Sequence, residues 1–161
     1  MDPFSIRPTV LTICIKGDKI LLIKRIGNDS LAGYYLPIGG HIDKDETFVE
    51  ASEREFLEET GLKSYNTKLK GILHQTGFYG KDVIMFTTTC DTGDGELITS
   101  EEGVPKWIPL SDLHKYKLLG NSITMIKTCQ KLKSNEIFIA TSRFDGHDKE
   151  LEFKIQIHQI S

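Results

Sequence analysis

The sequence predicts a single α/β (α+β) domain in which strands and helices interleave along the chain. Short runs rich in Val, Ile and Leu, bounded by turn-forming residues, recur throughout, and helical segments lie between them. The 161 residues are 39% hydrophobic and 27% charged, which suffices for one sizeable core. Because no internal repeat or linker divides the sequence, we expect one domain over residues 1–161.

Each predicted element follows from such a run and its turn signals. Strands are expected at residues 8–15, 19–24, 34–38, 68–74, 83–90, 106–109, 137–144 and 151–157. Gly17-Asp18 and Asp145-Gly146 indicate hairpin turns, because these residue types favour tight connections between strands. Helices are expected between the loop 41–46 and Gly61, after residues 111–112, and over residues 121–132.

The first of these helices carries the segment that indicates function, GHIDKDETFVEASEREFLEETGL. At about 100° per residue, Glu55, Glu58 and Glu59 fall on one face of the helix, where three like charges repel one another. Divalent cations would neutralise them, and carboxylate oxygens suit Mg²⁺ or Mn²⁺. A solvated face on which Arg54 merely pairs with Glu58 is the alternative.

The spacing from the first glycine of this segment to REFLEETGL matches the signature of the Nudix hydrolase family, which the chain therefore resembles. The resemblance implies the Nudix fold, a mixed β-sheet sandwiched between α-helices. It implies that Glu55, Glu58 and Glu59 hold Mg²⁺ or Mn²⁺ for hydrolysis of a phosphoanhydride, with the backbone carbonyl of Gly39 as a further ligand. Arg54 is then an orienting partner of Glu55 within the catalytic set.

Two further site expectations concern residues outside this helix. Gly40, next to Gly39, would let the backbone approach a cation or a phosphate, although the pair could also form a plain tight turn. Nudix enzymes often draw a fourth carboxylate, as metal ligand or general base, from a later loop. The segment SEEGVPKWIPLSDL resembles that region, with Glu102 as the expected acid ahead of Trp107 and Glu101 as the alternative.

Several features resemble the oxidised-purine nucleoside triphosphatase branch of the family, the 8-oxo-dGTP diphosphatase-like (MutT-like) enzymes. Tyr35 occupies the aromatic position before the glycines, Asn121 opens the later helix where related enzymes place a base-reading side chain, and RFDGHDKELEFKIQI resembles the C-terminus of that branch. Tyr35 as a core aromatic and Asn121 as a helix cap are the alternatives. Leu36 departs from the Asn common in that branch, which weakens an assignment to oxidised guanine. Lys24 and Arg25 end a strand and could meet phosphates or lie on a solvated surface.

We therefore expect a pyrophosphohydrolase, dependent on Mg²⁺ (or Mn²⁺), that converts a nucleoside triphosphate into a nucleoside monophosphate and pyrophosphate; an oxidised purine is one possible base. Hydrolysis of ADP-ribose, another nucleoside diphosphate derivative or a dinucleoside polyphosphate remains an alternative. A non-catalytic nucleotide-sensing module is a further one, which the intact acidic set disfavours.

Composition sets limits on partners and location. The formal net charge of −3 gives no excess of positive charge of the kind that binds duplex nucleic acid, so we expect no such partner. Cys14, Cys90 and Cys129 are odd in number and form no CxxC pair, so we expect reduced, buried thiols instead of disulfides or a zinc site. No run approaches eighteen apolar residues and the first residues do not resemble a secretory signal, so we expect no membrane partner and a cytoplasmic location. The sequence indicates no oligomeric state.

Overall fold

The computed structural model describes residues 5–161; the first four residues of the domain expected over 1–161 lie outside the described residues. The strands are β1 (Arg7–Lys16), β2 (Lys19–Arg25), β3 (Tyr35–Leu36), β4 (Ile38–His41), β5 (Ser64–Phe78), β6 (Lys81–Thr92), β7 (Gly103–Pro109), β8 (Glu136–Phe144) and β9 (Glu150–Gln159). The helices are α1 (Phe48–Thr60), the short 3-10 helix η1 (Leu110–Lys115) and α2 (Gly120–Lys131).

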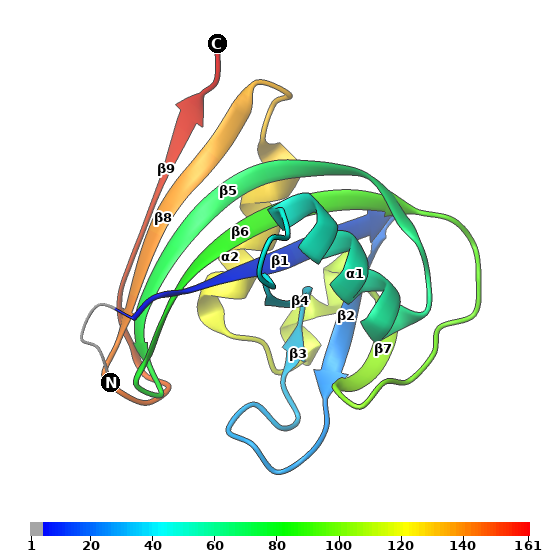
Figure 1. Ribbon diagram of the computed structural model, residues 1–161, viewed down its shortest axis with the longest axis horizontal. Helices are drawn as coiled ribbons and strands as arrows, with labels where there is room; N and C mark the ends of the chain where they lie inside the picture. The colour runs from blue at the N-terminus through cyan, green and yellow to red at the C-terminus, as the bar shows by residue number, and fades with distance from the viewer. Residues whose placement is uncertain (1–4) are drawn as a thin grey trace.

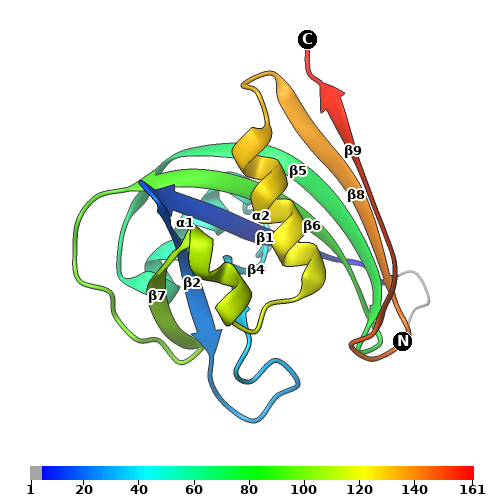
Figure 2. The same ribbon diagram turned by 180° about the vertical axis from the view of Figure 1, so that it is seen from behind.

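The strands form a mixed sheet, as the family resemblance implies. Its order is β3-β2-β1-β6-β5-β8-β9, with β4 also paired to β1 and β7 to β2. β1 runs parallel to β6 and β5 parallel to β8, while the hairpins β1-β2, β5-β6 and β8-β9 are antiparallel. The helix α1 covers one face of the strongly bent sheet (Figure 1), and α2 covers the other (Figure 2). The observed architecture therefore confirms the expected sandwich.

The core divides into two clusters, one on each side of the sheet. The cluster under α1 contains Cys14, Leu21, Ile23, Ile38, Phe56, Leu62 and Cys90. The larger cluster under α2 contains Ile13, Ile20, Leu22, Leu73, Ile108, Leu113, Met125, Ile126, Cys129, Phe138 and Ala140. Alternation along β2, whose successive side chains point to opposite faces, supplies both clusters from one strand. The three cysteines are free and buried, as expected.

The helix α1 is fixed at both ends and along its buried face. Thr47 caps its N-terminus in a reciprocal capping box with Glu50. Gly61 ends it in the left-handed conformation, with φ of 79°, that favours glycine. Phe56 is completely buried in the smaller core cluster. These contacts set the rotation of α1 and so decide which of its side chains face the rest of the site.

Some elements differ in extent from the sequence expectation. The expected strand 34–38 is interrupted at Pro37, which has no backbone N–H to donate to a neighbouring strand. It therefore forms two short strands, β3 and β4. β5 and β6 are longer than expected, because β-bulges let polar and glycine-containing stretches continue the pairing. In the described range 5–161, no helix has the length and apolar character needed to cross a membrane.

Candidate functional site

Acidic side chains from two distant segments meet beside α1. Glu55, Glu58 and Glu59 line a cavity of about 310 Å³ together with Ser100, Glu101 and Glu102. The last three residues belong to the loop that precedes β7. The helix acids and the expected loop acids thus share one cavity, and both members of the Glu101-Glu102 pair reach it.

Glu59 is the deepest of these acids, with only 3% of the residue exposed. The backbone N–H of Gly39 donates a hydrogen bond to its Oε2 at 3.4 Å. Burial raises the pKa of the Glu59 carboxyl to about 8, and the nearby charges of Glu55 and Glu102 act in the same direction. Ionising a buried carboxyl costs free energy, and a cation bound to the carboxylate offsets that cost.

Arg54 holds Glu55 and ties α1 to the loop before it. Its Nη1 donates to Oε1 of Glu55 at 2.9 Å and approaches Oε2 of Glu58 at 3.5 Å. Its other nitrogens bind Glu46 at 2.8 and 3.0 Å and the carbonyl of His41 at 2.9 Å. Burial raises the pKa of the Glu55 carboxyl, and the hydrogen bond from Arg54 opposes that rise. These contacts match the orienting role expected for Arg54.

Glu102 is paired with Arg25, one of the two basic residues at the end of β2 that the sequence offered as phosphate contacts. Nη1 of Arg25 forms an ion pair with Oε2 of Glu102, and Nη2 lies 2.7 Å from Oδ2 of Asp29. Lys24, the expected phosphate contact, is exposed and lies on the opposite face of β2 because adjacent strand residues alternate. The alternation of buried Leu21 and Ile23 was the signal that Arg25, two residues further, faces the acids.

The donor chemistry of this cavity fits Mg²⁺ or Mn²⁺, since every ligand group is an oxygen of a carboxylate, hydroxyl or backbone carbonyl. As the side chains stand, however, no three His, Cys, Asp or Glu residues in the described part of the chain are arranged to hold a metal ion. Two of these acids are paired with arginines: Glu55 with Arg54 and Glu102 with Arg25.

Close contacts require glycine at both positions 39 and 40. The alternative that the pair only forms a tight turn is therefore wrong. Both belong to β4, where they pair with Leu11 and Val10 of β1. A Cβ added to Gly40 would overlap the carboxylate of Glu55, and one added to Gly39 would overlap the backbone of Val10. The missing side chain at Gly40 is therefore what lets Glu55 lie against the backbone.

A second, mostly apolar hollow of about 220 Å³ has the same two glycines in its lining. Its lining includes Val10, Leu31, Leu36, Pro37, Gly39, Gly40, Gln75, Phe78, Met85, Leu119, Asn121 and Ser122. Asn121 is buried in the first turn of α2, where the N-cap is Leu119. Its Nδ2 donates to Oε1 of Gln75 at 3.2 Å and to Oγ of Ser142 at 3.4 Å. Asn121 is thus a buried polar group in a hollow, and the alternative of a helix cap is wrong.

Two aromatic residues singled out in the sequence lie in the core. Tyr35 packs against the larger cluster, and its ring meets that of Tyr116 edge-on, with centroids 4.8 Å apart. Trp107 packs against the smaller cluster. Among the described residues that line the apolar hollow, Tyr35 is not included, whereas its neighbour Leu36 is. The core-aromatic alternative for Tyr35 is the one that the structure favours.

Comparisons with known proteins agree with this geometry. Residues 5–129 match the NUDIX domain. The chain is 27% identical over 160 residues to the oxidized purine nucleoside triphosphate hydrolase of Danio rerio, covering 94% of this chain and 96% of that protein. It is 30% identical over 101 residues to the uncharacterized Nudix hydrolase YvcI of Bacillus subtilis, covering 60% of this chain and 61% of that protein.

Solved structures show the same fold. The mutator MutT protein of Bacillus halodurans superposes with a TM-score of 0.81 at 22% identity, covering 94% of this chain and 98% of that chain. The NUDIX domain of Shewanella oneidensis NrtR, solved in complex with ADP ribose, gives 0.69 at 19% identity, covering 81% and 92%. The structures show the fold, and the NUDIX domain match over most of the chain establishes that it belongs to the Nudix family and is a hydrolase of phosphoanhydride bonds.

Proposed function

We propose that this hydrolase cleaves a nucleoside triphosphate, with the aid of Mg²⁺ or Mn²⁺, into a nucleoside monophosphate and pyrophosphate. The observation that carries the proposal is that Gly39 and Gly40 line the apolar hollow and also contact Glu59 and Glu55 of the acidic cavity. One of these two hollows is lined by acids and the other is mostly apolar. A nucleotide has the matching division into a charged phosphate chain and a flat base, so a single molecule can occupy both hollows.

Polar groups in the apolar hollow suit recognition of a base edge. Within the described chain, no hydrogen bond engages the second amide atom of either Asn121 or Gln75. Whichever way the two amides are oriented, the pair therefore keeps one donor and one acceptor for a ligand. A base lacking the complementary groups would leave these buried amides unpaired, which is how a polar pocket rejects it.

The acidic cavity suits the phosphate chain. Glu55, Glu58, Glu59 and Glu102, with the carbonyl of Gly39, are the groups that would hold a divalent cation, which neutralises phosphate charge and makes a water molecule more acidic. Arg54 keeps the Glu55 carboxylate in place because it also binds Glu46 of the preceding loop and the carbonyl of His41 in β4. Arg25, which forms an ion pair with Glu102 beside the cavity, would be the group that neutralises a phosphate oxygen.

The similarity to the Danio rerio enzyme supports a triphosphate substrate, because the match extends over both hollows and nearly the whole chain. Because the Danio rerio enzyme is an oxidized purine nucleoside triphosphate hydrolase, an oxidised purine is the base to test first. ADP-ribose belongs in the same panel, since the NrtR domain binds it on this fold.

The test is incubation of the full chain with nucleoside triphosphates, oxidised purine triphosphates and ADP-ribose in the presence of Mg²⁺ or Mn²⁺, with detection of pyrophosphate and monophosphate. We expect pyrophosphate from a triphosphate. Binding without turnover of any member would support the sensing alternative and overturn the proposal.

Asn121→Ala tests the base-reading part separately. It should change the ratio of kcat/KM between different bases by about tenfold or more, because it removes part of a hydrogen-bonding pair. Equal loss of kcat/KM on every nucleotide would show that Asn121 supports the fold of the pocket without reading the base.

A further inference from the structure

We propose that the outer edge of β9 is a self-association surface at which two copies of this chain pair their β9 strands antiparallel. β9 is the last strand of the sheet, and its ten residues pair with β8 along one side (Figure 1). On its outer side, no strand from residues 5–161 pairs with it. An uncovered strand of this length presents a row of unpaired N–H and C=O groups, which is a template for another strand.

The side chains along this edge include apolar groups that only a partner could bury. Leu151 and Ile157 are 47% and 50% exposed. Phe153 and Ile155 are half-buried, and their register opposite Ser142 and Ala140 places them on the α2 side of the sheet.

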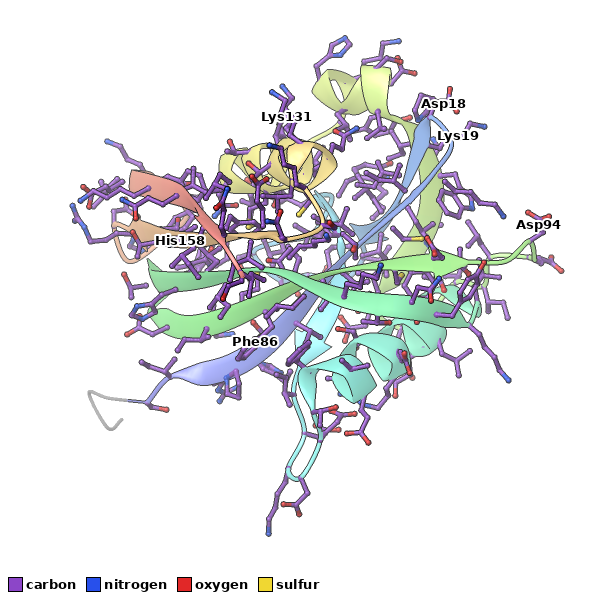
Figure 3. The ribbon with its side chains drawn as sticks, turned by 90° about the horizontal axis from the view of Figure 1, so that it is seen from above. Asp18, Lys19, Phe86, Asp94, Lys131 and His158 are labelled. Atoms are coloured by element: carbon purple, nitrogen blue, oxygen red, sulfur yellow. The ribbon has the colours of Figure 1, made fainter. Side chains whose placement is uncertain are left out.

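A hollow of about 260 Å³ lies beside this apolar row. It is lined by Thr128, Lys131, Leu132, Glu136, Ile155 and Ile157. It therefore runs between the end of α2, marked by Lys131 in Figure 3, and the strand that carries His158. The hollow continues the apolar surface of Ile155 and Ile157 toward Leu132 at the end of α2.

The charges on the opposite face of β9 identify the partner as a second copy. Glu152 and Lys154 lie two residues apart, and within one chain Nζ of Lys154 is 3.1 Å from Oε1 of Glu152. A lone lysine would protect a sheet edge from pairing. A lysine with an acid two residues away favours pairing with an antiparallel second copy. Each lysine then lies opposite the acid of the other copy across the twofold axis.

The charges of Glu152 and Lys154 fix the register. An axis through Phe153 sets Glu152 opposite Lys154 of the second copy, twice. An axis through Lys154 would bring two lysines together, and an axis through Ile155 would lose both ion pairs. The axis through Phe153 is therefore the one that pairs the opposite charges.

The test is sedimentation of the full chain over a wide concentration range, at low and high salt. We expect a dimer for the wild type. Lys154→Glu should weaken its association constant by about tenfold or more, because two ion pairs become two like-charge contacts. The double variant Glu152→Lys with Lys154→Glu should restore dimerisation. Lys63→Glu is the control for net charge, since this exposed residue lies between α1 and β5 and away from β9.

Three results would overturn the proposal: a monomer at every concentration, a dimer that Lys154→Glu leaves unchanged, or a charge-swapped double variant that does not recover. The urea midpoint of each variant shows that it is folded, and at exposed positions we expect it to stay at the wild-type value.

Discussion

Replacing Glu59 by glutamine should stabilise the metal-free protein at neutral and alkaline pH. The folded state raises the pKa of this carboxyl from 4.5 to about 8, mainly through burial. Below about pH 4.5 the group is protonated in both the folded and unfolded chains and does not lower the free energy of unfolding. As the pH rises toward 8 the unfolded chain releases the proton while the folded chain keeps it, so the free energy of unfolding falls.

The size of this effect follows from the pKa shift. At about 1.4 kcal/mol per pKa unit, the rise from 4.5 to about 8 corresponds to a loss of about 3–5 kcal/mol at pH 8. Glutamine has the same shape, keeps an oxygen to accept the hydrogen bond from Gly39, and cannot ionise. The variant should therefore exceed the wild type by about that amount at pH 8 and match it near pH 4.5.

The assay is urea unfolding in EDTA between pH 4.5 and 8.5, followed by the fluorescence of Trp107, the single tryptophan. Glu58→Gln is the matched control: it removes an acid from the same helix face, but its side chain is 58% exposed, so the pH dependence should remain. The burial argument is refuted if Glu59→Gln loses stability with pH as steeply as the wild type. Adding Mg²⁺ or Mn²⁺ should recover stability in the wild type and much less in Glu59→Gln.

Three further predictions concern neighbouring residues. Gly40→Ala should cost less than about 1 kcal/mol of stability, because the carboxylate of Glu55 can move aside, yet turnover should fall at least tenfold since Glu55 is then misplaced. Gly39→Ala should cost about 1–3 kcal/mol because its clash is with the backbone of Val10, so equal urea midpoints for the two variants would contradict this reasoning. Glu58→Gln should lower the rate of pyrophosphate release by about a hundredfold or more with little change in unfolding free energy, and near-normal turnover would exclude Glu58 from catalysis.

The secondary-structure elements and the acids on α1 could be predicted because they depend on local patterns. The strand runs, the Gly17-Asp18 hairpin and the stop at Gly61 each reflect a backbone preference of nearby residues. The carboxylate face of α1 follows from helix periodicity. The mixed sheet between helices and the loop acid Glu102 were expected from the family resemblance, because they depend on how distant segments meet.

The other half of the site depends on contacts between segments far apart in the chain. Gln75 and Ser142 reach Asn121 only through the parallel pairing of β5 with β8, which a local pattern does not specify. Lys24 and Arg25 have the same charge, so their sequence does not say which of them lies near the acids. That depends on which face of β2 points toward α1 and the loop before β7. The sequence likewise offered Tyr35 as an aromatic near the glycines without showing that it packs against Tyr116.

The contact of Gly39 and Gly40 with both parts of the site has a consequence for selection under the function proposed above. Their backbone pairs with β1, touches Glu55 and Glu59, and lines the apolar hollow. A substrate that contacts the acids and fills the hollow would have to pass these glycines. The distance between its base and its scissile bond would then be selected along with the base itself.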